Sequence, residues 1–220
     1  MDTANIQTKL DQIRSLQTDR ILHFQYSKKA KIPFKVHSFL EIMNCRILDF
    51  CEGTDLLIRN NHIIPSLSLI RSLIENIATT YRAVTSIETS LESNKLNENF
   101  DELITKLIFG TRYEGETVAI NIMTQIDKLD KEYNGIRKAY DSLSEFVHPN
   151  WDGVGGSYSD LNESEGFTSI SKVITTEHPI YKLIETGFLL CMGIYLEFSH
   201  KITEYLPEFS SLCESEINQK

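Results

Sequence analysis

The chain has 220 residues, which is enough for one domain of ordinary size. Hydrophobic residues make up 41% of the sequence and charged residues 24%, near the averages of globular proteins, so the composition excludes wholesale disorder. The net charge of −9 argues against unspecific binding to duplex DNA, which needs a basic surface, although a local basic patch is compatible with it.

Proline positions and apolar spacing divide the chain into a series of helices. Pro33, Pro65 and Pro179 lie where long helical patterns begin, whereas Pro149 and Pro207 lie where such patterns end, because proline lacks the backbone N–H and has a fixed φ. We expect helices over about residues 3–25, 35–60, 65–92, 98–112, 116–131, 133–148 and 179–206, with a short terminal piece after the last. No segment alternates strands with helices, so the sequence predicts an all-α helical bundle.

Two of these helices carry a continuous apolar stripe. In the helix at 65–92 the stripe comprises Leu67, Ile70, Ile74, Ile77, Tyr81 and Val84, spaced by three and four residues. The helix at 179–206 repeats this spacing from Ile180 to Ile202. Long helices with such stripes pack antiparallel in bundles. We therefore expect a single helical domain over 1–220, with N-terminal helices at 1–62 and a core bundle at 63–206.

Residues 149–177 break the helical pattern. Four of the ten glycines lie here, among many Ser, Asn and Asp residues. A structureless loop of this length is uncommon inside a compact domain. The segments Val154–Tyr158 and Phe167–Ile174 flank a turn-rich stretch at 160–166. We therefore expect a small β-hairpin or an irregular insertion near 150–177.

Several features favour a cytoplasmic location. Cys45, Cys51, Cys191 and Cys213 form no C-x-x-C pair, and their mostly apolar helical surroundings suit buried thiols in a reducing compartment. Residues 1–10 lack the apolar core of a signal peptide, and the most apolar stretch, at 187–196, is too short to cross a bilayer. The six histidines include no H-x-x-x-H pair, so we expect neither a metal site nor a cofactor.

The helix expected at 133–148 carries an unusual polar row beside its apolar stripe. At 100° per residue, this row contains Arg137, Asp141, Ser144 and His148, whereas Tyr140 belongs to the apolar stripe. Such an edge is where a helix meets its neighbour. His148 ends the helix, where the macrodipole favours an imidazolium.

The helix at 65–92 offers a matching edge, with Arg71 and Glu75 one turn apart beside its apolar stripe. These two residues form either an ordinary i,i+4 ion pair or one side of a groove that faces Ser144 and His148. Because each helix has an apolar stripe flanked by a polar row, we expect the two helices to be direct neighbours.

The run from Tyr140 to Trp151, YDSLSEFVHPNW, together with the spacing Arg71-x-x-x-Glu75, resembles an uncharacterised family of bacterial helical proteins. In that family an Arg-x-x-x-Glu helix is paired with a helix that ends in Ser-x-x-x-His-Pro. The family is allied to the HEPN class of helical bundles, which occurs among toxin, phage-defence and RNA-processing proteins. The resemblance covers roughly residues 65–165.

This resemblance implies a HEPN-like homodimer that acts on RNA or a nucleotide in a defence or toxin–antitoxin context. His148 would be the general acid/base, Arg71 the phosphate-stabilising cation, and Glu75 the group that orients one of them. The residues lining the groove would be Arg137, Tyr140, Asp141, Ser144, Asn150 and Trp151.

The HEPN ribonuclease motif itself is absent from the sequence. Those enzymes carry an arginine, four to six other residues and then the histidine, but here the nearest upstream arginine, Arg137, lies eleven positions before His148. That separation is about 16 Å along a helix. Metal-independent ribonuclease activity would therefore need Arg71 to supply the cation. The alternative is a non-catalytic helical interaction or ligand-sensing module, whose polar groove fixes the helix register.

Overall fold

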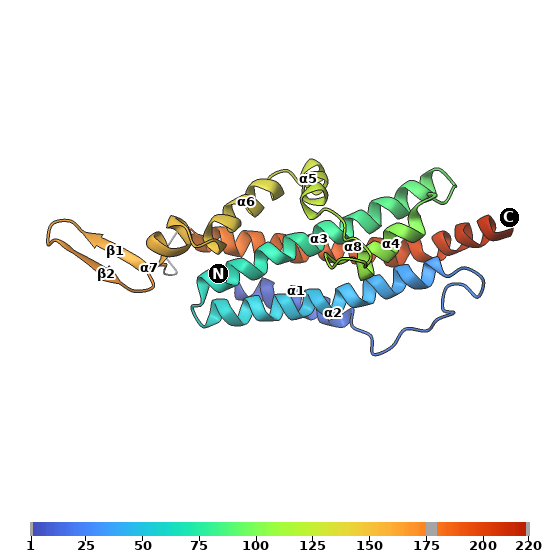
Figure 1. The fold of residues 1–220 in the computed structure, drawn as a ribbon. Helices are drawn as coiled ribbons and strands as arrows, with labels where there is room; N and C mark the ends of the chain where they lie inside the picture. The colour runs from blue at the N-terminus through green and yellow to red at the C-terminus, as the bar shows by residue number, and fades with distance from the viewer. Residues whose placement is uncertain (1, 175–179, 219–220) are drawn as a thin grey trace.

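The computed structural model describes residues 2–174 and 180–218, and over these ranges the protein is a helical bundle with one small hairpin (Figure 1). The elements are α1 (Thr3–Ser15), α2 (Ile32–Arg59), α3 (Ile63–Glu92), α4 (Phe100–Phe109), α5 (Ile122–Glu132), α6 (Ile136–Val147), the π-helical turn η1 (Trp151–Gly155), α7 (Gly156–Tyr158), β1 (Ser159–Asn162), β2 (Phe167–Ile170) and α8 (Ile180–Asn218). With 71% of the structure helical, the expected all-α class is confirmed.

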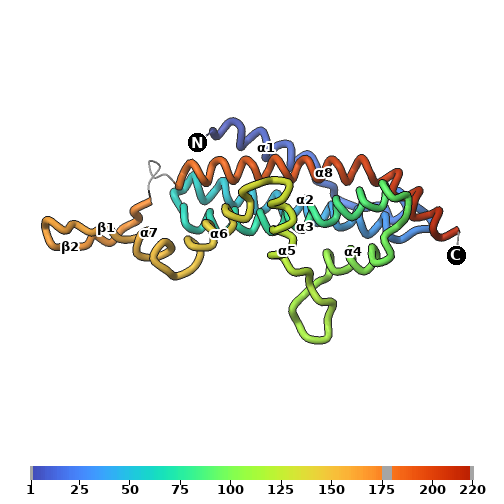
Figure 2. The backbone as a smooth tube through the Cα atoms, turned by 90° about the horizontal axis from the view of Figure 1, so that it is seen from above, coloured from blue at the N-terminus to red at the C-terminus, as the bar shows by residue number. Residues whose placement is uncertain are grey.

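Three long helices form the centre of the bundle. α3 packs against both α2 and α8, and the three run side by side along the molecule (Figures 1 and 2). Leu67 and Ile70 of α3 and Phe188, Tyr195 and Phe198 of α8 are almost completely buried. Burial of such side chains stabilises the fold by roughly 25 cal/mol per Å² of apolar surface. The apolar stripes that the sequence predicts for these two helices therefore form the core.

The shorter helices α5 and α6 both pack on α3, so the expected neighbour relation between the helices at 65–92 and 133–148 is confirmed. α6 begins after Gly135, whose φ of +100° suits only glycine well. The Asp130 carboxylate accepts hydrogen bonds from the backbone N–H groups of Gly135 and Arg137, at 2.9 Å each. These bonds fix the corner between α5 and α6, and with it the course of α6 along α3.

Residues 148–172 form an arm that projects beyond one end of the bundle (Figure 1). The arm consists of η1, α7 and the hairpin, in which β1 and β2 are antiparallel with Ser159 opposite Ile170. It leaves the bundle at the end of α6. It returns at Lys172, whose Nζ donates to the Asn61 carbonyl at 3.5 Å and lies 3.4 Å from His62 Nδ1. The arm is thus attached near both of its ends.

The hairpin exists, but the strands differ from the sequence prediction. Val154–Tyr158 is helical rather than a strand, and β2 ends at Ile170 rather than at Ile174. The cause of the first difference is local: the Asn150 side chain accepts a hydrogen bond from the Gly153 N–H at 3.0 Å, which starts a helical turn. Strand pairing therefore begins only at Ser159.

Two helix boundaries in the first half of the chain also correct the prediction. α1 ends at Ser15 rather than near residue 25, because the spacing of its buried residues stops at Ile13 and residues 18–20 are exposed. α5 begins at Ile122 rather than near residue 116. Residues 117–119 pair with Thr111 instead of forming a helix, since the Thr111 N–H donates to the Thr117 carbonyl at 2.8 Å and the Thr111 carbonyl accepts from the Ala119 N–H at 3.1 Å. The Asn121 side chain then caps α5 by accepting from the Thr124 N–H.

α8 continues through Pro207 to Asn218, so the expectation that a helix ends at this proline is wrong. Proline removes one backbone hydrogen bond from a helix interior. However, α8 buries Phe209 and Cys213 beyond it, and the Phe209 ring packs 4.8 Å from the ring of Phe100. Tertiary packing therefore outweighs the local cost. Pro179, at the expected start of this helix, lies outside the described residues.

The cysteines are free, and Cys51, Cys191 and Cys213 are buried as expected, whereas Cys45 is exposed. Within residues 2–174 and 180–218, no helix combines the length and the apolar character that crossing a membrane requires.

Candidate functional site

Arg71 is the centre of a polar network between α3 and α6. Its Nε donates to Ser144 Oγ at 2.9 Å, its Nη2 donates to Tyr140 Oη, and its Nη1 lies 3.3 Å from Glu75 Oε1. Tyr140 Oη in turn donates to Glu75 Oε1 at 2.8 Å. The guanidinium also stacks on the Tyr140 ring, 4.5 Å from its centroid. Four of the predicted site residues therefore meet, and all three guanidinium nitrogens are engaged within the network.

The Arg71 network (Arg71, Glu75, Tyr140 and Ser144) is closed rather than open to a ligand. Tyr140 is only 4% exposed, and burial, followed by its hydrogen bond to Glu75, raises the pKa of its phenol. The phenol therefore stays protonated and passes a hydrogen bond from Arg71 to Glu75. This geometry suits a positioning role, because it holds α6 in register on α3 and engages each guanidinium nitrogen within the network.

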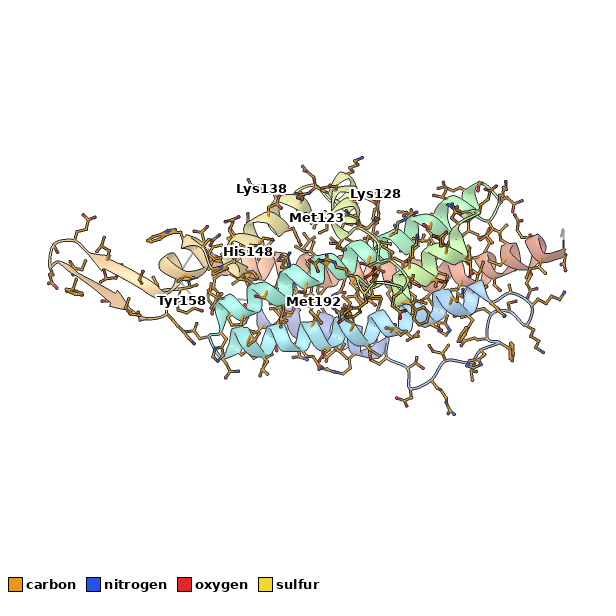
Figure 3. All side chains as sticks on the ribbon, viewed as in Figure 1. Met123, Lys128, Lys138, His148, Tyr158 and Met192 are labelled. Atoms are coloured by element: carbon orange, nitrogen blue, oxygen red, sulfur yellow. The ribbon has the colours of Figure 1, made fainter. Side chains whose placement is uncertain are left out.

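His148 stands apart from this network, at the exposed junction between α6 and the arm (Figure 3). Its backbone N–H donates to the Ser144 carbonyl at 3.1 Å, and its own carbonyl accepts from the Asn150 N–H at 2.8 Å. Among the described residues, the imidazole makes no hydrogen bond or ion pair. The structure thus brings Arg71 to Ser144 but not to the His148 ring.

Arg137 and Asp141 belong to a different cluster. Arg137 Nε donates to both carboxylate oxygens of Asp141, at 3.1 and 3.0 Å, and its Nη1 binds Asp127 of α5. Hydrogen bonds to Asp141 and Asp127 raise the pKa of the guanidinium. This exposed cluster ties α6 to α5 and does not extend the Arg71 network, so the polar row predicted along α6 divides into two groups.

Asn150 and Trp151 lie at the root of the arm. Asn150 donates from Nδ2 to Glu145 Oε2 at 2.6 Å, and its Oδ1 caps the turn that follows. The Trp151 side chain is exposed, with one ring face against the backbone of Gly155: a Cβ added there would lie 2.6 Å from the ring. Both residues shape the arm rather than line a groove with Arg71.

Comparisons of the chain with protein-family models, with curated protein sequences and with solved structures find no match. In the part of the chain that the structure describes, no group of three or more His, Cys, Asp or Glu side chains is arranged to hold a metal ion. The exposed surfaces and polar clusters of the protein are therefore the remaining guide to its function.

Proposed function

We propose that the protein is a non-catalytic helical interaction module whose arm docks on a protein partner. The observation that carries this proposal is the set of exposed apolar side chains on the arm, comprising Trp151, Val154, Leu161, Phe167 and Ile170. Contiguous exposed apolar surface on a folded protein marks an interaction site. A two-stranded hairpin is also marginally stable by itself in water, so a partner that covers it supplies the missing packing.

Two of the exposed apolar side chains of the hairpin share one face, whereas Phe167, which pairs with Asn162, lies on the other face. Residues paired across strands share a face, and faces alternate along each strand. The register pairs Ser159 with Ile170 and Leu161 with Thr168, so Leu161 and Ile170 lie on the same face. These two side chains are 62% and 80% exposed. We call this surface the hairpin face.

The charge of the arm selects the kind of partner. It contains four acidic residues, Asp152, Asp160, Glu163 and Glu165, against one base, Lys172. An acidic arm repels the phosphates of a nucleic acid and also the equally acidic arm of a second copy of this chain. The complementary partner is a protein with an apolar groove rimmed by basic residues.

The Arg71 network supports this function by fixing the root of the arm. α6 leads directly into the arm, and the bonds from Arg71 to Tyr140 and Ser144 hold α6 on α3. A rigid root limits the entropy that the arm loses on docking.

The proposal is tested with the double variant Leu161→Ser/Ile170→Ser, with Ser169→Ala on the opposite hairpin face as control. A protein captured on the wild type from cell extract is purified and titrated against each variant. We expect the double variant to bind at least about tenfold more weakly, because two aliphatic side chains lose their burial, while the control binds like the wild type. Equal binding of the double variant, or capture of nucleic acid instead of protein, contradicts the proposal.

A second candidate is the RNA- or nucleotide-directed HEPN-like function, which the exposed and unpartnered ring of His148 favours. In that case His148→Ala abolishes RNA cleavage or nucleotide binding. Because the ring is exposed, the change lowers the stability by no more than about 1 kcal/mol and leaves the melting temperature almost unchanged. Activity on RNA that persists in the variant, or its absence from the wild type, excludes this candidate.

We also propose that the chain forms a homodimer through α8. Leu183 and Leu190 are exposed and lie seven residues apart, on one face of that helix. Light scattering at micromolar concentration should give twice the 25.3 kDa of one chain, and Leu190→Glu should halve that mass. A wild-type mass of one chain contradicts the dimer.

A further inference from the structure

A cavity lined by α3, α4 and α5 collects positive charge in an otherwise acidic protein. It has a volume of about 380 Å³ and opens between α3, α4, α5 and residues 118–121. Arg82, Lys106 and Lys128 line it, against a single carboxylate, Glu102, which binds Lys106 at 2.5 Å. The cavity therefore has a net formal charge of +2 in a chain whose total is −9.

Two of these cations are available to a ligand. Among the described residues, neither Arg82 nor Lys128 has a carboxylate partner. Two helix N-termini add to the positive potential, since Asn99 and Asn121, the residues that precede α4 and α5, both line the cavity. Helix N-termini favour anions through their free N–H groups and the macrodipole.

Gln125 provides an independent sign of a missing ligand. It lines the cavity, is only 7% exposed, and its Oε1 has no hydrogen-bond partner among the described residues. Its Nε2 donates to the Asn121 carbonyl at 3.5 Å. A buried acceptor without a donor costs free energy, and a ligand that carries a donor would remove that cost.

From these observations we propose that this cavity binds a small organic phosphate that carries hydroxyl or amino donors. The cations and helix N-termini hold the phosphate, as guanidinium and ammonium groups do elsewhere. Gln125 Oε1 accepts a hydrogen bond from the organic part of the ligand. The volume is near the lower end of ligand sites, roughly 300–1,000 Å³, which suits a nucleoside monophosphate or a sugar phosphate. This site is separate from the arm and does not depend on the proposed docking function.

The test is calorimetric titration of the full-length protein in phosphate-free, low-salt buffer. The probes are AMP, ribose 5-phosphate, inorganic phosphate and, without a phosphate group, adenosine. We expect saturable binding of AMP or ribose 5-phosphate, weaker binding of inorganic phosphate and none of adenosine. Tighter binding of AMP would place the hydrogen-bond donor on the base, and tighter binding of ribose 5-phosphate would place it on the sugar. No saturable binding of either at concentrations up to about 5 mM overturns the proposal.

Variants separate this site from unspecific attraction. Arg82→Gln and Lys128→Gln should each weaken the organic phosphate about tenfold, whereas Lys138→Gln, on α6 outside the cavity, should change its affinity by less than about twofold (Figure 3). Gln125→Met should weaken the organic phosphate but not inorganic phosphate, without lowering the melting temperature, because it removes an unpaired polar atom. Equal losses in Arg82→Gln and Lys138→Gln overturn the proposal, and an unchanged affinity in Gln125→Met overturns the role of Gln125.

Discussion

Arg71→Ala is expected to destabilise the protein by about 2–3 kcal/mol, because it leaves Glu75 and the buried Tyr140 hydroxyl without their cationic partner. It also removes the stacking on the Tyr140 ring. For a domain of this size, the melting temperature should fall by about 4–12 °C. Thermal unfolding followed by circular dichroism measures this shift.

The matched control is Lys106→Ala on α4. Lys106 also forms an i,i+4 pair, with Glu102 at 2.5 Å, but both side chains are exposed to solvent. Its loss should cost less than about 1 kcal/mol. Arg71→Lys should give an intermediate result, because an ammonium cannot reproduce the three separate contacts of the guanidinium. If Arg71→Ala and Lys106→Ala melt alike, the Arg71 network does not stabilise α6.

Phe209→Ala is expected to cost about 3–5 kcal/mol, because it leaves a cavity beside Phe100 and frees the last part of α8. The melting temperature should fall by at least about 6 °C. Glu208→Ala, an exposed change one position earlier, should alter the stability by no more than about 0.5 kcal/mol. The same thermal unfolding measurement compares the two variants.

Pro207→Ala is the complementary variant, since it restores a helical N–H at an exposed position. It should stabilise the protein by about 1–3 kcal/mol. A loss of stability would mean that packing of Phe209 depends on the backbone geometry that Pro207 imposes. A Phe209→Ala variant as stable as Glu208→Ala would mean that α8 does not pack beyond Pro207.

Hydrophobic periodicity was sufficient to predict the fold class and the α3–α6 contact. Both results depend on long patterns: a stripe such as Leu67 to Val84 leaves little freedom in which face of the helix is buried. The same reasoning pointed to Arg71 and Ser144, because a polar residue beside a stripe lies at a helix–helix boundary. The hydrogen bond between them follows from that placement.

Local rules failed where contacts distant in sequence decide the structure. Pro207 is a valid stop signal by itself, but the burial of Phe209 against Phe100, over a hundred residues away in the chain, outweighs it. Within the arm, one side-chain cap at Asn150 converts an expected strand into a helical turn. Both effects depend on partners that periodicity does not reveal.

The candidate site residues and the cationic cavity were the features that the sequence predicted least well. Ser144, which binds Arg71, lies one helical turn before His148. The helix ends at Val147, however, and His148 has an extended backbone and an exposed side chain. The cavity that Arg82, Lys106 and Lys128 line has no sequence signature, because its residues come from separate elements. The three cations lie in the interior or the second half of their helices, so no helix-start pattern marks them in the sequence.

Because the arm is attached to the bundle at two places, a force on its tip acts on the bundle at both of them. One end continues from α6, which packs on α3 at Arg71 and Glu75, and the other end contacts the turn just before α3, through Lys172 at Asn61 and His62. A force applied at the hairpin tip is therefore transmitted to a single helix at two points along its length. Because α3 is also the helix that contacts α2, α5 and α8, a load on the arm reaches the whole bundle through it.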